Sequence, residues 1–203
     1  MPSLLDLLKP RPTRPLPDFP RIDWRNVMPA SALLFYGGGP AITQMAATRM
    51  YRHPYHPAAF HAALYLGNGD FLNVGKFKTV ERLSQEFRST RRIDVISYEM
   101  PGDVADAIAR DGYRDADKPK VGMSLPTYGV TDFLRFGLKW WKPSTKDICS
   151  ENVTEILRAH GVECAEPSEP FNVAPWHLLE WAEKNPSMCQ IKTIHVGGDF
   201  RTA

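Results

Sequence analysis

Cys149 is the residue best placed to act as a nucleophile. It stands at the start of "KDICSENVTEILRAHG", in which Val153, Ile156 and Leu157 form an apolar stripe with helical spacing and Gly161 ends the helix. Free backbone N–H groups and the positive end of the helix dipole stabilise a thiolate in a first turn. The alternative is a buried structural cysteine at a helix start, and position alone does not separate the two.

A cysteine nucleophile needs a base, and the base needs a group that orients it. In "FHAALYLGNGDFLN", His61 begins an apolar strand, and Asn73 lies in a second strand after a Gly-Asn-Gly turn. A lone histidine in such a strand is also a common core residue. The pair is of chemical interest if both side chains face one place.

The loop of this hairpin decides whether His61 and Asn73 meet. In a three-residue loop with Gly69 in the left-handed conformation of a bulge, Ala63 pairs with Asn73, and His61 becomes a diagonal neighbour of Asn73 on one face. In a two-residue Asn-Gly turn, Leu64 pairs with Asn73 instead, and His61 points the other way. A Cys-His-Asn triad therefore requires the odd loop.

The other cysteines and histidines fit no site template. Cys164 and Cys189 lie in or beside loops that contain proline, and three cysteines without a C-x-x-C pair suggest neither a disulfide framework nor a thiolate zinc site. A mixed zinc site would need His53, His56, His61 and Cys149. Their H-x2-H-x4-H spacing matches no zinc template, so we expect no metal and no cofactor.

The elements that position these residues mix strands and helices without regular alternation. Strands are expected in 31–36, 60–66, 70–73, 77–83, 91–99 and 190–197, and helices in 41–51, 101–112, 128–141, 146–161 and 174–185. The helix over 101–112 is expected to end at Gly112. This pattern predicts an α+β fold with an antiparallel sheet.

The first 28 residues differ from the rest of the chain. Prolines at 10, 12, 15, 17 and 20 predict an extended, polyproline-like arm over 1–28, followed by one domain over 29–203. The arm is either a loose leader or a docking segment for a protein partner, because "LLDLL" before the prolines is apolar enough to occupy a groove.

Composition excludes several classes of protein. With 43% hydrophobic and 24% charged residues, the 203-residue chain is not wholly disordered. A net charge of +2 with scattered basic residues gives no case for nucleic acid. No apolar run reaches the length of a membrane span, and "MPSLLDLLKP" is too short and too acidic for a secretory signal. We therefore expect a cytoplasmic protein unless something else carries it out.

"HAALYLGNGDFLN", followed far downstream by "ICSENV", resembles the circularly permuted branch of the NlpC-type, papain-like cysteine peptidase superfamily, which includes amidase-like lipoproteins and relatives of lecithin retinol acyltransferase. In this branch the histidine and the third polar residue precede the cysteine, as His61, Asn73 and Cys149 do here. "CSE" is closer to the amidase-like members than to the "NCEH" of the acyltransferases. In the acyltransferase-like pattern the third residue is commonly a second histidine, whereas asparagine serves in papain-like enzymes.

The resemblance covers about residues 29–197 and implies a permuted papain-like fold, with an antiparallel sheet packed against the helix that carries Cys149. It implies that Cys149 attacks a carbonyl, His61 is the base and Asn73 orients it, with Tyr36 as a candidate oxyanion donor. Trp140 and Trp141 are candidates for a substrate groove or for the core.

The expected substrate is a peptide amide bond of peptidoglycan, and an acyl ester or amide of a lipid is the second choice. A cell-wall enzyme without an export signal would fit a phage protein carried in the virion, with the arm as its docking segment. The competing class is a non-catalytic assembly protein, for example of a phage tail or baseplate, that keeps the fold.

Overall fold

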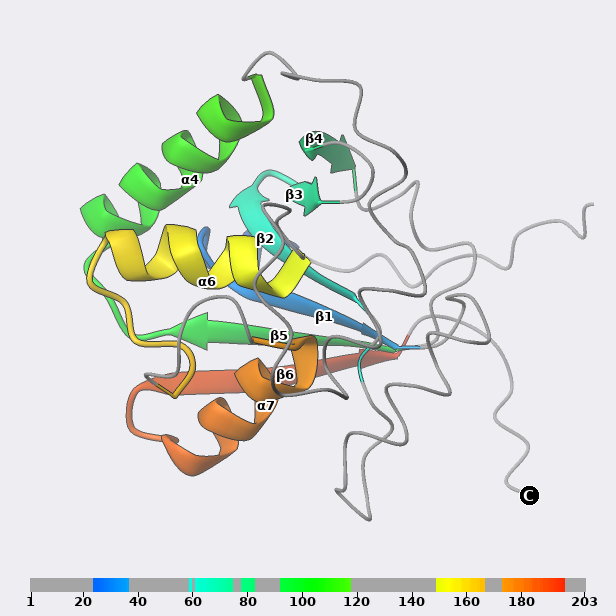
Figure 1. Cartoon of the computed structure of the whole chain (residues 1–203), viewed down its shortest axis with the longest axis vertical. Coiled ribbons are helices and arrows are strands. Elements are labelled where there is room, and N and C mark those ends of the chain that lie inside the picture. The colour runs from blue at the N-terminus through cyan, green and yellow to red at the C-terminus, as the bar shows by residue number, and fades with distance from the viewer. Residues whose placement is uncertain are drawn as a thin grey trace, which may run out of the picture.

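The computed structural model describes residues 24–36, 59, 61–74, 78–82, 92–117, 149–166 and 173–195. Within these ranges the chain forms one antiparallel sheet of six strands and three α-helices (Figure 1). The strands lie side by side in the order β4-β3-β2-β1-β5-β6. The expected α+β class with an antiparallel sheet is confirmed.

The strands are β1 (Ala32–Tyr36), β2 (His61–Gly67), β3 (Asp70–Val74), β4 (Lys78–Arg82), β5 (Arg92–Tyr98) and β6 (Cys189–His195). Almost every residue of β1, β2 and β5 is buried, which explains why they read as continuous apolar runs. β4, at one edge, is half exposed and carries polar residues. Burial on both faces thus places β1 and β2 at the centre of the molecule.

The described helices cover one face of the sheet. They are α4 (Gly102–Asp117), α6 (Cys149–Ala159) and α7 (Pro175–Lys184). α4 and α6 pack on β2, and α7 packs on β6 (Figure 1). We call this face of the sheet the helix side and the opposite face the far side.

Each face has its own apolar cluster. On the helix side, Leu34 and Leu64 of the sheet join Val153 and Leu157 of α6 in the larger cluster. The far-side cluster consists of Val27, Leu33, Phe35, Ala63, Tyr65, Phe71, Ile93 and Val95. Neighbouring residues of one strand therefore alternate between the two clusters, as the pleat of a strand requires.

The last residues of the expected arm pack on the far side. Trp24 lies in a short 3-10 helix, Trp24–Asn26, and its ring lies 5.4 Å from the ring of Tyr65, between centroids. Val27 is 6% exposed and belongs to the far-side cluster. The packed part of the chain therefore includes Trp24, five residues before position 29. Residues 1–23, with the prolines, lie outside the described residues.

The β2–β3 hairpin combines the two loops considered from the sequence. Gly67 pairs with Asp70 around a two-residue turn, in which Asn68 and Gly69 have φ angles of 54° and 83°. Positive φ at both positions is the signature of a type I′ turn. The register then shifts between Tyr65 and Gly67, where one extra residue bulges from β2.

This bulge gives the hairpin its odd register. Tyr65 pairs with Phe71 and Leu64 with Leu72, a register that continues to Ala63 opposite Asn73. The expected pairing of Ala63 with Asn73 is therefore correct, and so is the left-handed conformation of Gly69. The expected three-residue loop is wrong, because the extra residue lies before the turn.

Gly112 does not end α4, which continues to Asp117. A Cβ atom at this position would lie 2.5 Å from a methyl carbon of Leu66 in β2. Glycine is therefore placed here for close contact between α4 and the hairpin. Reading it as a C-cap was wrong, since a stop signal and a packing glycine look the same in sequence.

α6 begins and ends as expected. Gly161 follows the helix with a φ angle of 76°, and the Val162 N–H donates to the Leu157 carbonyl over 3.0 Å, as in a Schellman motif. The expected helices over 41–51 and 128–141 lie outside the described residues. Among the helices that the structure does describe, none has both the length and the apolar character needed to cross a lipid bilayer.

Candidate active site

His61 and Asn73 meet on the far side of the sheet. His61 Nε2 lies 2.8 Å from Asn73 Oδ1, which is hydrogen-bonding distance. The His61 ring also packs against the ring of Phe35, its cross-strand partner, with 5.6 Å between the centroids. The predicted proximity of the two polar residues is confirmed, and the imidazole is held from two directions.

The contact continues beyond Asn73 to the edge strand β4. Asn73 Nδ2 donates to Glu81 Oε1 over 3.0 Å, and Thr79 Oγ1 donates to the same oxygen over 2.7 Å. Asn73 pairs directly with Thr79 across the strands. Sequence analysis singled out neither Thr79 nor Glu81. Their alternation in "KTVER" is the signal that places both side chains on the face of Asn73 once the register is known.

Cys149 is the first residue of α6, as predicted. Its side chain is 2% exposed and belongs to the helix-side cluster. The first turn is tied down, because Ser150 Oγ donates to the Val173 carbonyl over 2.5 Å and Thr154 Oγ1 donates to the Ser150 carbonyl over 2.8 Å. The N-terminal dipole of α6 acts on a thiol that packing holds in place.

The Cys149 thiol lies on the helix side of the sheet, whereas the His61 imidazole points to the far side. Ala62 belongs to the helix-side cluster, so the preceding His61 points to the far side, with Phe35. Both residues stand first in their elements, and α6 packs on β2. The Cys149 end of α6 points toward the end of the sheet where β1 finishes and β2 starts (Figure 1). The two residues thus lie toward the same end of the sheet but on opposite faces of it.

Tyr36, the candidate oxyanion donor, ends β1 on the helix side. It is 2% exposed and belongs to the same cluster as Cys149. The Arg92 guanidinium carbon lies 4.7 Å from the centroid of its ring. Arg92 also binds both carboxylate oxygens of fully buried Asp94, with Nε at 2.9 Å and Nη2 at 2.5 Å, and Thr193 donates to the same carboxylate. A fixed cation thus stands over the phenol ring.

The Arg92 guanidinium stays charged in this setting. Burial on its own lowers the pKa of Arg92, but the hydrogen bonds and the charge of Asp94 outweigh it, so the pKa is raised. Removing one partner would leave the other charge uncompensated in the interior. The pair therefore serves as a rigid support beside Tyr36.

Cys164 and Cys189 have settings unlike that of a nucleophile. Burial raises the pKa of the Cys164 thiol to about 12, against smaller opposite effects of Arg158 and Thr154. Burial also raises the pKa of Cys189, whose thiol donates to the Ala182 and Asn185 carbonyls. Both thiols are protonated at neutral pH, so neither is a candidate nucleophile.

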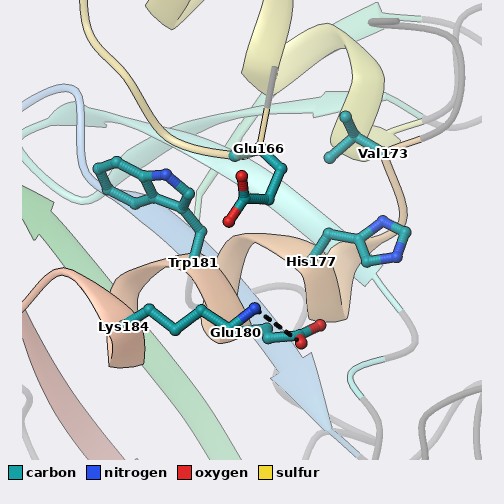
Figure 2. A pocket seen from close by; sticks show the side chains of 7 residues that line it. Glu166, Val173, His177, Glu180, Trp181 and Lys184 are labelled. Atoms are coloured by element: carbon teal, nitrogen blue, oxygen red, sulfur yellow. Dashed lines mark ion pairs between the residues drawn. The ribbon is translucent and has the colours of Figure 1, made fainter. Parts of the chain in front are cut away.

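A hollow of about 230 Å³ lies on the helix side, between α7 and the segments on either side of 167–172 (Figure 2). It is lined by Ala165, Glu166, Val173, His177, Glu180, Trp181 and Lys184. Val173 accepts the hydrogen bond from Ser150, so the hollow adjoins the first turn of α6. Glu180 and Lys184 form an ion pair of 3.2 Å on its rim. His177, whose Nδ1 accepts the Ala174 N–H over 3.0 Å, is fixed at the first turn of α7.

The structure describes some of the remaining histidines and neither of the two candidate groove tryptophans. His160, directly after α6, has its Nε2 2.9 Å from Asp111 Oδ2 of α4. His53 and His56, which the zinc alternative needs, lie outside the described residues. The same holds for Trp140 and Trp141.

The described residues thus bring an imidazole and an amide together, with a thiol at the start of a neighbouring helix. Thiol, imidazole and amide are the groups of papain-like acyl transfer chemistry. Comparisons of the chain with models of protein families, with characterised proteins and with solved structures found no match.

Proposed function

We propose that the chain is a cysteine hydrolase of the amidase or peptidase type, with Cys149 as nucleophile, His61 as general base and Asn73 as the residue that orients His61. The observation that carries this proposal is the 2.8 Å contact between His61 Nε2 and Asn73 Oδ1. It occurs at the start of β2, on which the Cys149 helix packs.

The reaction has two stages. In the first, the Cys149 thiol proton passes to His61, and the sulfur attacks the carbonyl carbon of the amide. The tetrahedral intermediate collapses, the C–N bond breaks, and the amine leaves with the proton from His61. In the second stage, His61 takes a proton from water, the hydroxide attacks the thioester, and the acid leaves as the proton returns to Cys149 sulfur.

The electrostatics of the site suit a thiolate. Asn73 is neutral, so it stabilises an imidazolium less than a carboxylate would. The start of α6 therefore supplies most of the stabilisation of the Cys149 sulfur anion. The oxyanion would bind the Cys149 backbone N–H and one side-chain donor, for which Tyr36 is the candidate because it shares a cluster with Cys149.

The order of the elements supports a permuted papain-like fold. The strand of His61 and the strand of Asn73 come first, and the helix of Cys149 follows. With the sequence resemblance, this order makes a peptide amide of peptidoglycan the proposed substrate. The hollow beside Val173 adjoins the start of α6 and is a candidate place for part of that substrate. Action in the cytoplasm and action from a phage particle are each compatible with this substrate and this site.

The second candidate is a non-catalytic assembly protein, and one observation favours it. Cys149 is only 2% exposed, and His61 leaves its strand on the opposite face of the sheet. In an assembly protein these residues would serve packing alone, and the residues before 24 would dock the protein to a partner.

The test is digestion of purified peptidoglycan, with mass analysis of the released fragments. We compare the wild type with Cys149→Ala, and use Cys189→Ala as a matched control because Cys189 is also buried. The proposal predicts fragments with a new amine end from the wild type and the control, and none from Cys149→Ala.

A second arm uses lipid ester and lipid amide substrates with the same three proteins. Cys149-dependent release of fatty acid without peptidoglycan cleavage would assign the site to lipids. Absence of Cys149-dependent cleavage in both arms would reject the hydrolase and favour the assembly protein.

A further inference from the structure

On the far side of the sheet, a series of hydrogen bonds runs from His61 through Asn73 and ends at the carboxylate of Glu81. The side-chain amide of Asn73 bridges two groups, with Oδ1 2.8 Å from His61 Nε2 and Nδ2 3.0 Å from Glu81 Oε1. The contacts run from β2 through β3 to β4 without a gap. Each hydrogen bond joins neighbouring strands of one sheet, so the register of the sheet fixes the positions of all three side chains.

Glu81 determines which group donates and which accepts in the hydrogen bonds between His61, Asn73 and Glu81. An ionised carboxylate only accepts hydrogen bonds, so the Asn73 atom that faces it must be the NH2 group. The Asn73 carbonyl oxygen then faces His61, and an oxygen acceptor requires an N–H donor on Nε2. Neutral His61 is thereby set to carry its proton on Nε2 and its lone pair on Nδ1.

Glu81 is itself held in place. Thr79 Oγ1 donates to the same carboxylate oxygen over 2.7 Å, two residues earlier on the same face of β4. Two donors on one oxygen limit the rotation of the carboxylate. The two ends of an asparagine amide are nearly equal in shape. Without the anchored carboxylate of Glu81, the Asn73 side chain could therefore turn over.

We infer that Glu81 is a positioning residue, which fixes the amide of Asn73 and through it the tautomer of His61. Its negative charge, passed on through the polarised amide, also stabilises the imidazolium form of His61. The consequence for catalysis rests on the proposed function: Nδ1 becomes the nitrogen that accepts the Cys149 proton, and the distant carboxylate compensates for a neutral third residue.

The test is nitrogen-15 NMR of the histidine rings in the full chain, which distinguishes the two tautomers and follows the pKa directly. The signals of His61 are identified by their absence in His61→Gln. The variants are Glu81→Met, which removes the acceptor, and Glu81→Gln, which keeps an acceptor oxygen and removes the charge. Glu99→Met, on an exposed glutamate after β5, is the matched control.

In the wild type and in Glu99→Met, we expect the Nε2–H tautomer of His61. Glu81→Met should raise the share of the Nδ1–H tautomer about fivefold, the change that one hydrogen bond of ordinary strength supports. Glu81→Gln should restore the wild-type tautomer and still lower the pKa of His61, because the charge is gone. A purely structural role of Glu81 would produce neither the rescue nor the separate effect on the pKa.

The inference is overturned if Glu81→Met leaves the tautomer of His61 unchanged, or if it unfolds the protein while Glu81→Gln leaves the pKa of His61 unchanged. These readouts need no substrate and no reactive cysteine. If the tautomer shifts as expected while the wild type cleaves neither peptidoglycan nor lipid, the positioning role of Glu81 stands and the proposed hydrolase fails.

Discussion

The two faces of the sheet carry different kinds of structure. The helix side has the larger cluster, three described helices and Cys149. The far side has a smaller cluster, covered in part by Trp24, and at its edge the polar chain from His61 to Glu81. Among the described residues, the helix side thus provides most of the apolar burial, and the far side holds the hydrogen bonds that join His61, Asn73 and Glu81.

This division explains why the candidate site lies at the end of the sheet. A polar side chain within either cluster loses water and needs a partner built into the fold, as Asp94 has in Arg92. At the start of β2, His61 is 5.6 Å from the aromatic ring of Phe35 yet reaches Asn73. The thiol, at the start of α6, is fixed by the core of the opposite face.

The largest effect should come from truncating neighbouring leucines of β1 that face opposite sides. Leu34 lies in the helix-side cluster and Leu33 in the far-side cluster, and both are fully buried. Leu34→Ala should lower the free energy of unfolding by about 4 kcal/mol, and Leu33→Ala by about 2–3 kcal/mol, because the far-side cluster of described residues is the smaller of the two and can relax further into the cavity. Urea denaturation measures both. An equal or reversed order would break the distinction between the faces.

A smaller effect is expected at the turn that sets the register of the hairpin. Gly69 has a φ angle of 83°, and no atom lies within 4 Å of the position of an added Cβ. Gly69→Ala should therefore cost about 1 kcal/mol of stability from backbone strain alone. Gly102→Ala, also in open space but without a positive φ, is the control and should be neutral or slightly stabilising. A loss of stability as large in Gly102→Ala would show that strain at the turn is not the cause.

The smallest effect concerns Cys164, the inert thiol of the helix side. Its pKa is raised from 9.0 to about 12 by burial, so the folded state keeps this proton to higher pH than the unfolded state does. The free energy of unfolding should therefore fall as the pH rises through about 9, by about 0.4 kcal/mol at pH 9 from this group. Cys164→Ala should flatten this slope between pH 8 and 10. A slope identical to that of the wild type would show that Cys164 ionises as it does in water.

Local patterns were enough to predict most of the described elements. The apolar runs of β1 and β2 follow from burial on both faces, and the stripe of α6 follows from burial that repeats with the helical period. The contact of His61 with Asn73 was also accessible, because the side-chain period of a strand leaves only two choices of face.

The errors arose where a residue serves a distant partner. Gly112 accommodates Leu66, which lies 46 positions earlier, and no local rule distinguishes this from a helix stop. The bulge lies before the turn, although the loop length suggested that it lay within it. Glu81 could not be found until the register between β3 and β4 was known, because it lies 20 residues after His61 in the chain.

The reactivity of Cys149 tests the central claim, that a thiol of the helix side and an imidazole of the far side act together around the start of β2. Iodoacetamide labelling at neutral pH, followed by mass analysis of each cysteine, gives the three rates in one sample. The account predicts that Cys149 reacts at least tenfold faster than Cys164 or Cys189, and that His61→Ala lowers its rate about 100-fold. A Cys149 rate no higher than the other two, or unchanged in His61→Ala, would contradict it.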